Sequence, residues 1–419
     1  ELQRYSEPLQ LVHRRTQIPM TVLDVSSLDV EEQNHAVAAF VDQERTTSFQ
    51  LDRAPLLRVF IHVRAASTIQ FTLSFHHAIL DGWSVASLQT ELFNRYAELL
   101  GFPDAVTGDT PLAITPRTVV AQERQALQSQ PDREFWARYL DGHQFSALPR
   151  AEPDSLPPQA RVRGARIAAD LSDALQLLAA RLGVPLRTVL LTAHLRVLSL
   201  LSGKQDVTSG LVCNVRPESV DGDKGIGRFL NTLPLRLALE PGSWEALVRR
   251  TYASELEVLE HRNYPYFQLH LDNGRVGYFD VVFNYTNFHV YEQLQSRQDQ
   301  PEFRAGFEST GYGLGVNFSF DPASGLVLEV SPAALSASQA ERIRDHYLAV
   351  LQAMVRDSTA RHEAQPLLAD RAGQAAEELV RLLPATATRI GADGDEVVAV
   401  AELVPGDRVR IRPGETVPA

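Results

Sequence analysis

The feature that most constrains this 419-residue chain is an alternating run that ends in two histidines. From Ile69 to Phe75 every odd position is apolar, and the side chains of a strand alternate between its two faces. Extending this alternation sends His77 to the apolar face and His76 to the opposite one. Asp81 follows four residues after His77. An imidazole at a strand end with a carboxylate nearby is a candidate acid–base site, although an isolated histidine is more often a hydrogen-bonded core residue.

The spacing of the apolar residues changes directly after this run. Beyond Gly82 they lie three or four positions apart, the periodicity of an amphipathic helix: Val85, Leu88, Leu92, Tyr96 and Leu99. Ser84 is the predicted N-cap of this helix. The histidines and the aspartate therefore lie where a strand passes through a tight loop into a helix, with backbone N–H groups nearby.

Strand and helix patterns also follow one another along the rest of the chain, which favours an α/β organisation. Further helices are predicted near residues 30–45, 171–182, 186–201, 244–261 and 336–354, the last opened by a capping box, Ser336-x-x-Gln339. Further strands are predicted near residues 57–63, 161–167, 207–213, 230–239, 280–285, 315–320 and 326–330.

Composition restricts the function classes. The formal net charge is −12, so a nucleic-acid partner is not expected. The single cysteine, Cys213, cannot form an internal disulfide, which fits a reducing cytosol. The most apolar window, residues 184–200, contains Arg187, His194 and Arg196, which are too costly for a lipid-facing helix, and the first residues lack a signal-peptide pattern. The sequence contains no His-Glu-x-x-His motif, cysteine cluster or phosphate loop.

Several motifs occur in an order that is typical of one known family. They are Phe49-Gln50-Leu51 with Pro55-Leu56-Leu57-Arg58, then His76-His77-x-x-x-Asp81-Gly82 extended by Trp83-Ser84, then Asn231-Thr232-Leu233-Pro234-Leu235-Arg236, and finally Phe283-Asn284-Tyr285 with Phe288-His289. On these motifs, residues 1–365 resemble the condensation domains of nonribosomal peptide synthetases, which belong to the chloramphenicol acetyltransferase-like superfamily.

The resemblance implies an α/β fold in which two acetyltransferase-like subdomains form a V with a central tunnel. The proline-rich stretch Pro149–Pro158 marks the expected boundary, which gives subdomains over residues 1–150 and 158–365. The strand–helix unit and the first motif that open this family are absent. We therefore expect the N-terminal subdomain to be truncated, and the chain to be weakly soluble or inactive without that segment.

The resemblance also implies a reaction, in which the amine of one carrier-bound aminoacyl thioester attacks a carrier-bound acyl or peptidyl thioester and forms an amide. We expect His77 either to accept a proton from the amine or only to orient it, with His76 in support. Asp81 is either the partner of a histidine or holds the loop against a buried cation. By resemblance to the Asp–Arg pair of the family, that cation is Arg236, with Arg58 as the second candidate.

Gly82 has two interpretations, a turn that requires positive φ or an N–H group that stabilises an oxyanion. Five further residues are expected to line the substrate tunnel, although each asparagine among them could equally cap a turn: Trp83, Ser84, Asn231, Asn284 and Asn317. His289 is expected to be structural.

The resemblance implies no intrinsic cofactor, because the phosphopantetheine arm belongs to the carrier domains that deliver the substrates. The expected partners are donor and acceptor peptidyl carrier domains and a neighbouring adenylation domain, in the cytoplasm. The alternatives are an epimerisation domain, for which the second half offers no clear glutamate base, an ester-forming acyltransferase, and a non-catalytic carrier-docking module. Docking variants lose the histidine motif, and His76 argues against a cyclisation domain, which carries aspartate there.

After about residue 365 the sequence changes character. Residues 370–419 resemble the start of a heavy-metal P-type ATPase actuator domain, most clearly in Ala401–Asp407 and Arg412–Pro418. Val409 and Ile411 alternate with arginines between two Pro-Gly turns, which predicts a β-hairpin. The Thr-Gly-Glu, Asp-Lys-Thr-Gly and Cys-Pro-Cys motifs of that family are missing. We therefore interpret the segment as a partial actuator-like fragment that cannot pump ions.

Overall fold

The computed structural model describes residues 9–101, 114–143, 145, 148, 162–219, 221–287, 312–321, 325–333, 335–364, 386–391, 394–399 and 409–410. Internal contacts divide the chain into two compact units. The first is Glu1–Thr118 with Arg216–Phe229, and the second is Val119–Val215 with Leu230–Ala419. The first long segment of unit one therefore ends at Thr118, and the second unit begins at the next residue. The boundary predicted at Pro149–Pro158 lies outside the described residues.

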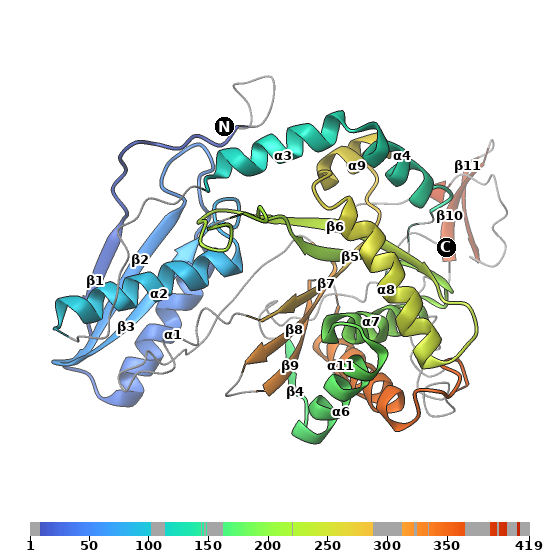
Figure 1. The fold of residues 1–419 in the computed structure, drawn as a ribbon. Coiled ribbons are helices and arrows are strands. Elements are labelled where there is room, and N and C mark those ends of the chain that lie inside the picture. The colour runs from blue at the N-terminus through green and yellow to red at the C-terminus, as the bar shows by residue number, and fades with distance from the viewer. Residues whose placement is uncertain are drawn as a thin grey trace. The chain divides into compact units, whose positions relative to one another are not determined.

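The first unit contains a three-stranded sheet with a helix on each face (Figure 1): β1 (Met20–Asp24), α1 (Val30–Thr46), β2 (Leu57–Ala65), β3 (Thr68–Phe75) and α2 (Gly82–Leu99). Strand β2 is central, parallel to β1 and antiparallel to β3. Phe40 of α1 packs on Phe60 with 4.7 Å between ring centroids, and Phe93 of α2 packs on Phe71 of the other face at 5.9 Å. The two helices therefore cover opposite faces of the sheet.

The second unit is built on a six-stranded sheet with the order β4-β9-β8-β7-β5-β6. Its strands are β4 (Arg163–Arg166), β5 (Asp206–Asn214), β6 (Leu230–Ala238), β7 (Val281–Thr286), β8 (Leu314–Asp321) and β9 (Gly325–Pro332). Its helices, with α3 beginning in the first unit, are α3 (Pro116–Gln128), α4 (Gln130–Tyr139), α6 (Ala169–Leu182), α7 (Leu186–Ser202), α8 (Trp244–Glu260), α9 (Tyr266–Asp272) and α11 (Ala337–Arg356).

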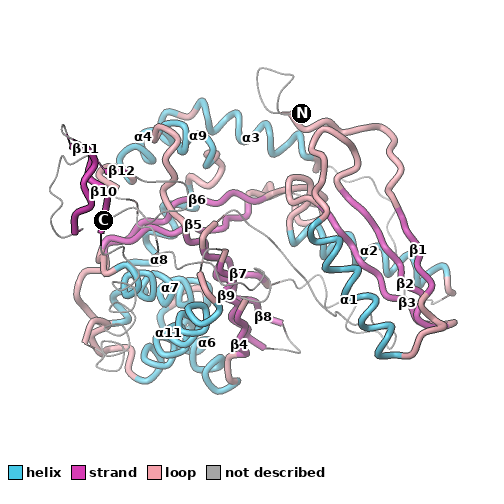
Figure 2. The backbone as a smooth tube through the Cα atoms, turned by 180° about the vertical axis from the view of Figure 1, so that it is seen from behind, coloured by secondary structure: helices cyan, strands magenta, loops and turns pink. Residues whose placement is uncertain are grey.

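Helices α6, α7 and α11 gather on one face of this sheet (Figure 2). Alternate strand residues such as Phe283, Phe318 and Leu328 point into the core beneath them and are fully buried. The opposite face carries the residues between them, including Asn284 and Asn317, which are half-buried. The two faces therefore differ in polarity, as strand periodicity requires.

Local capping explains where several helices begin and end. Asp29 caps α1 in a capping box with Glu32, and Ser336 caps α11 in the predicted box with Gln339. Helix α6 ends at Gly183 with φ of 67°, and α7 ends at Gly203 with φ of 68°, a backbone conformation in which glycine has no Cβ penalty. Because these capping signals are local in sequence, they could be recognised before the structure. The helices predicted near residues 30–45, 171–182, 186–201, 244–261 and 336–354 are confirmed.

The C-terminal segment forms a small antiparallel sheet with the order β11-β10-β12. Strands β10 (Thr386–Gly391) and β11 (Gly394–Ala399) pair directly, and β12 (Val409–Arg410) pairs with the other edge of β10. A β-hairpin in the C-terminal tail is therefore confirmed, formed by β10 and β11, and Val409 and Arg410 add a third strand to it. The two Pro-Gly turns and Ile411 lie outside the described residues.

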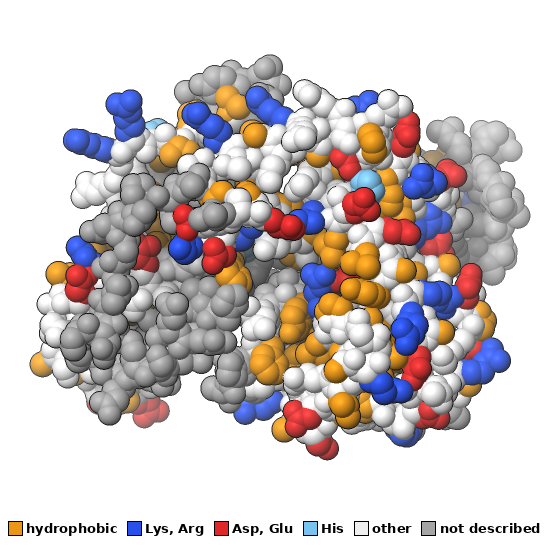
Figure 3. Space-filling model, viewed as in Figure 1, with side chains coloured by type: hydrophobic (Ala, Val, Ile, Leu, Met, Phe, Trp, Pro, Cys, Tyr) orange, Lys and Arg blue, Asp and Glu red, His pale blue; other side chains and the backbone are white. Residues whose placement is uncertain are grey.

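No single helix among the described residues is long and apolar enough to span a membrane; α6 and α7 pass that test only as a pair bent by 105°. Helix α7 lies in the protein core, with eleven buried residues. The face of the second unit seen in Figure 3 mixes acidic and basic side chains with apolar ones.

One buried histidine of the first unit should make the stability of that unit depend on pH. His62 on β2 is 1% exposed, and neither ring nitrogen has a hydrogen-bond partner. Burial lowers its pKa from 6.5, and Arg64 adds to the effect. Below pH 6.5 the imidazole of His62 is protonated in the unfolded chain but stays neutral in the folded chain. The free energy of unfolding of this unit should therefore fall as the pH drops below 6.5.

We expect His62→Leu to flatten the loss of thermal stability between pH 7.5 and pH 5, measured by the unfolding temperature of the first unit. Exposed His35 on α1 provides the control, since His35→Leu should leave the pH profile unchanged. An unchanged slope in His62→Leu would show that other groups cause the acid sensitivity.

Candidate functional site

The two histidines follow β3 and lie on different faces of the sheet. The ring of His77 packs edge-on against Phe75, two residues earlier, with 5.7 Å between centroids. His76 instead approaches Phe49 at 6.2 Å. Its backbone N–H continues the ladder by donating to the carbonyl of Leu56 at 3.0 Å, and Nδ1 accepts the N–H of Ala78 at 3.1 Å. Strand alternation thus extends through the pair, and both rings are half-buried.

Asp81 is the centre of the loop that follows, and its buried carboxylate is hydrogen-bonded on every side. It is 1% exposed. Oδ1 accepts the N–H of Ser84 at 2.7 Å and a guanidinium N–H of Arg216 at 3.0 Å, while Oδ2 accepts the N–H of Phe229 at 2.8 Å. Asp81 is thereby the N-cap of α2 as well as the partner of a buried cation.

Arg216 makes the matching set of contacts from the segment between β5 and β6. Its side chain is 5% exposed, donates to the carbonyl of Gly225 at 2.6 Å and to the hydroxyl of Ser84 at 2.8 Å, and stacks over Phe229 at 4.2 Å. Burial lowers its pKa, and the charge of Asp81 opposes that shift. An arginine remains charged in such a setting, which makes it a suitable partner for a buried carboxylate.

The expected ion pair between Asp81 and Arg236 was wrong. Arg236 holds Asp206 with 2.7 Å between Nη2 and Oδ2, and also donates to the carbonyl of Asp141. The second candidate, Arg58, pairs with Glu44. Residue type and closeness to a motif could not identify the partner, because the contact joins positions 135 residues apart. The available signal was an arginine two residues after a buried strand, at the start of a glycine-rich segment.

Ser84 was also assigned wrongly, both as the N-cap and as a residue that lines the tunnel. It is fully buried, and its hydroxyl donates to the carbonyl of Gly227 at 2.7 Å and accepts the N–H of the same residue at 3.1 Å. Next to it, Trp83 donates from Nε1 to the carbonyl of Asp223 at 2.7 Å. Both side chains therefore fasten the segment Arg216–Phe229 to the start of α2.

Gly82 is the first residue of α2 and is not among the described glycines with positive φ. The interpretation as a left-handed turn was therefore wrong, while its role as an N–H donor to an oxyanion stays a prediction.

Asn231 is held by the backbone of the loop before α9: its amide donates to the carbonyls of Arg262 and Tyr264, and its oxygen accepts the N–H of Tyr266. This structural alternative accounts for all three contacts. His289 lies outside the described residues.

Asn284 and Asn317 lie directly opposite each other on β7 and β8. Glu329 of β9 continues the same row, with Asn317 as its register partner. The oxygen of Asn317 is buried without a hydrogen-bond partner, and Glu329 is exposed and accepts the hydroxyl of Ser331 at 3.1 Å. We call Asn284, Asn317 and Glu329 the polar row. Glu329 could not be identified from the sequence, because its place in the row depends on strand register.

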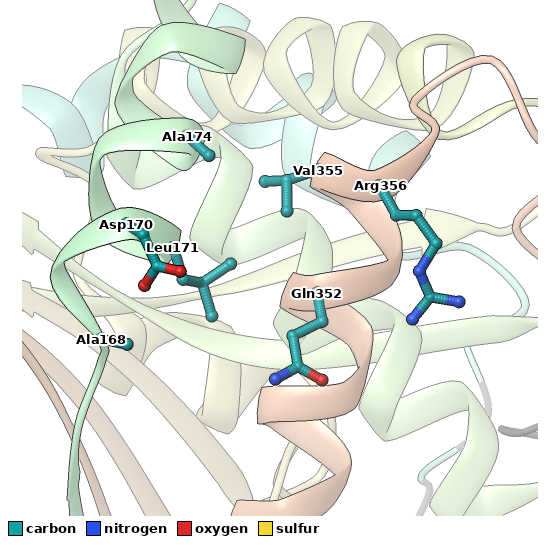
Figure 4. A pocket seen from close by; sticks show the side chains of 7 residues that line it. All are labelled: Ala168, Asp170, Leu171, Ala174, Gln352, Val355 and Arg356. Atoms are coloured by element: carbon teal, nitrogen blue, oxygen red, sulfur yellow. The ribbon is translucent and has the colours of Figure 1, made fainter.

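Two other features of the second unit do not resemble a reaction centre. His194 is fully buried and hydrogen-bonded through both ring nitrogens, to Tyr347 and to Ser209 at 2.7 Å each. A cavity of about 410 Å³ opens between α6 and α11, where Asp170, Gln352 and Arg356 supply the polar part of a lining that contains no histidine or cysteine (Figure 4). Among the described residues, no group of three or more histidine, cysteine, aspartate or glutamate side chains could hold a metal ion.

Solved structures show which fold this is. The chain resembles the condensation domain of the monacolin K polyketide synthase MokA, with a TM-score of 0.65 at 20% identity over 83% of this chain and 82% of that one. It also resembles part of a four-domain nonribosomal peptide synthetase bound to AMP and glycine, with a TM-score of 0.70 at 16% identity over 83% of this chain and 28% of that one. The class is thus an α/β protein of the chloramphenicol acetyltransferase-like fold.

The family follows from the sequence match. The family model of the condensation domain matches residues 1–375, and the chain belongs to that family. Condensation domains are the peptide-bond-forming acyltransferases of nonribosomal peptide synthetases, and they act on substrates tethered to carrier proteins. A second model, the P-type ATPase actuator domain, matches only residues 381–419.

Curated relatives are much longer proteins. The AMB antimetabolite synthetase AmbE of Pseudomonas aeruginosa is 33% identical over 75% of this chain, which covers 15% of that protein. Gramicidin S synthase 2 of Brevibacillus brevis is 28% identical over 70% of this chain, which covers 7% of that protein. The chain thus spans less than a sixth of the length of these synthetases.

A double-mutant cycle tests the assignment of Arg216 as the partner of Asp81. Asp81→Asn and Arg216→Met should each destabilise the start of α2 by about 3–5 kcal/mol, because each leaves a buried charge without its partner. Their combination should fall short of the sum by about 0.5–3 kcal/mol. Hydrogen exchange of α2 peptides measures the local opening free energy.

Arg236→Met is the matched control in the same cycle. Its effect should add to that of Asp81→Asn within about 0.5 kcal/mol, because its described polar contacts go to other residues. Additivity with Arg216→Met and coupling with Arg236→Met would reverse the assignment.

Proposed function

We propose that this chain forms an amide bond between a donor acyl or peptidyl thioester and an acceptor aminoacyl thioester, each carried on the phosphopantetheine arm of a carrier domain. The observation that carries the proposal is a half-buried His77 at the end of β3, followed by a loop that the Asp81–Arg216 pair holds rigidly. The match of residues 1–375 to the condensation-domain family supports it. The family membership and the long synthetase relatives support donor and acceptor carrier domains and an adjacent adenylation domain as partners.

In the proposed reaction the amine nitrogen forms a bond to the thioester carbon, and the carbon–sulfur bond breaks. His77 accepts a proton from the attacking amine and returns it to the leaving thiolate, so that no other reactant is required. The N–H of Gly82 at the start of α2 is the proposed donor to the oxyanion. His76 supports this arrangement from the other face of the sheet, and Asp81 acts through the loop and not on the substrate.

The polar row of the second unit is the proposed determinant of substrate choice. Asn284, Asn317 and Glu329 lie on neighbouring strands, so the row extends roughly 10 Å across the sheet. The exposed carboxylate of Glu329 can accept hydrogen bonds. It suits a substrate that brings N–H donors, such as the amides of the arm or a basic aminoacyl side chain.

Transfer between loaded carrier proteins by the domain with its native N-terminus, followed by intact mass, tests the reaction. His77→Ala should lower kcat about 10²–10⁴-fold if the imidazole carries the proton, and less if it only orients the amine. His35→Ala, on the exposed surface of α1, should leave kcat unchanged. Absence of any amide product with a range of acyl and aminoacyl substrates, or full activity in His77→Ala, would contradict the proposal.

Substrate selection by the polar row predicts a specific loss. Glu329→Gln should reduce kcat/KM about tenfold to a hundredfold for acceptors with a basic side chain and leave neutral acceptors unaffected, because a charge-assisted hydrogen bond is removed. Competition between a basic and a neutral aminoacyl carrier measures the preference. Glu341→Gln, which removes a carboxylate paired with Arg163 elsewhere in the unit, serves as the control. An equal loss for both acceptors would remove Glu329 from the specificity site.

A further inference from the structure

Arg58 connects the end of α1 to the strand that precedes the histidine pair. Its Nε and Nη2 atoms lie 2.7 and 2.6 Å from Oε1 of Glu44, and Nη2 also donates to the carbonyl of Thr47 at 2.8 Å. The side chains of Arg58 and Glu44 are only 20% and 12% exposed. The guanidinium plane therefore has a fixed position, set by one carboxylate and one backbone carbonyl.

Phe49 contacts both the guanidinium of Arg58 and the ring of His76, the first histidine of the pair. The guanidinium carbon of Arg58 lies 3.9 Å from the centroid of the Phe49 ring, a cation–π contact. The ring of His76 meets the same phenyl ring at 6.2 Å with an interplanar angle of 82°, an edge-to-face geometry. Phe49 is thus held between the cation and the imidazole.

The remaining contacts of His76 are with the backbone. Nδ1 accepts the N–H of Ala78, so the neutral ring carries its proton on Nε2, and the carbonyl of His76 accepts the N–H of Ile79 at 3.1 Å. The ring and the turn after it therefore share one arrangement. Because His77 lies within that turn, a rotation of the His76 ring would also move the direction in which His77 projects.

We propose that Glu44, Arg58 and Phe49 form a positioning cluster for the histidine pair. They fix the ring of His76 from the α1 face of the sheet, and His76 in turn fixes the turn that aims His77. None of the three is proposed to touch the substrate. The effect on catalysis rests on the proposed function, while the effect on the histidine rings does not.

Arg64 offers a matched comparison within the same strand. Its position is also on the α1 face of β2, where it donates to Gln33 at 3.1 Å and to Asn34 at 2.5 Å, so it joins the same helix to the same strand. It lies six residues further along β2, away from the end that pairs with Phe75. If the only role of Arg58 were to join α1 to β2, replacing Arg58 or Arg64 should have the same effect on kcat and on the histidine ring signals.

The test compares Arg58→Met, Arg58→Lys, Phe49→Leu and Arg64→Met in the domain with its native N-terminus. Unfolding temperatures establish the structural cost of each. The readouts are kcat and KM for loaded carriers, and the NMR signals of the His76 and His77 rings labelled at Cε1. We expect Arg58→Met and Phe49→Leu to lower kcat about tenfold to a hundredfold at unchanged KM and to shift both ring signals. Arg58→Lys should recover part of the effect, and Arg64→Met should change neither readout.

The two proposals fail in different ways. If the domain with its native N-terminus makes no amide, the proposed function is wrong, and the ring signals still decide whether Arg58 and Phe49 position the histidines. Unmoved signals in Phe49→Leu and Arg58→Lys, or equal losses of kcat in Arg58→Met and Arg64→Met, would overturn the positioning cluster. Should Arg58→Met not fold, Phe49→Leu and Arg58→Lys still decide between the two outcomes.

Discussion

The buried ion pair between Asp81 and Arg216 determines most of the structure around the histidines. The strands β5 and β6 pair with each other along their whole length, and the chain between them leaves the second unit to join the first. Burial of an aspartate and an arginine is costly, and the cost is offset only where every lone pair and N–H finds a partner. Here the backbone of Phe229, the backbone and hydroxyl of Ser84 and the carbonyl of Gly225 complete the set. The start of α2 therefore depends on a segment far away in the sequence.

Two adjacent histidines become chemically different because they follow a strand. His76 turns to the face that α1 covers, where it accepts a backbone N–H and packs on Phe49. His77 turns to the face of Phe75. A helix would have placed both side chains within 100° of each other on one surface, whereas a strand assigns them to opposite environments. The pair can thus divide into one residue that supports the loop and one that reaches the reaction.

The sequence predicted those parts of the site that local rules control. Alternation placed His76 and His77, and periodicity placed α2 and the capped start of α11. It failed where two residue types of similar propensity compete: Asp81 and Ser84 are both good N-caps, and the ion pair with Arg216 decides for Asp81. It failed again at Arg236, because nothing near a carboxylate in sequence reveals which of many arginines will lie beside it in space. Glu329 required the register of β8 and β9, which depends on the packed sheet.

The contrast between His194 and His77 shows what sequence composition cannot decide. His194 has a serine and a tyrosine as neighbours, a set of side chains that also occurs in catalytic sites. One ring nitrogen of His194 bonds to the hydroxyl of Tyr347 and the other to the hydroxyl of Ser209, and the hydroxyl of Ser209 also lies 3.1 Å from the carbonyl of Val281. Burial lowers the pKa of His194 to about 3. Every proton in this chain of bonds is committed, and no substrate can reach it. A histidine that is to exchange protons with a substrate must keep part of its ring exposed, as the half-buried His77 does.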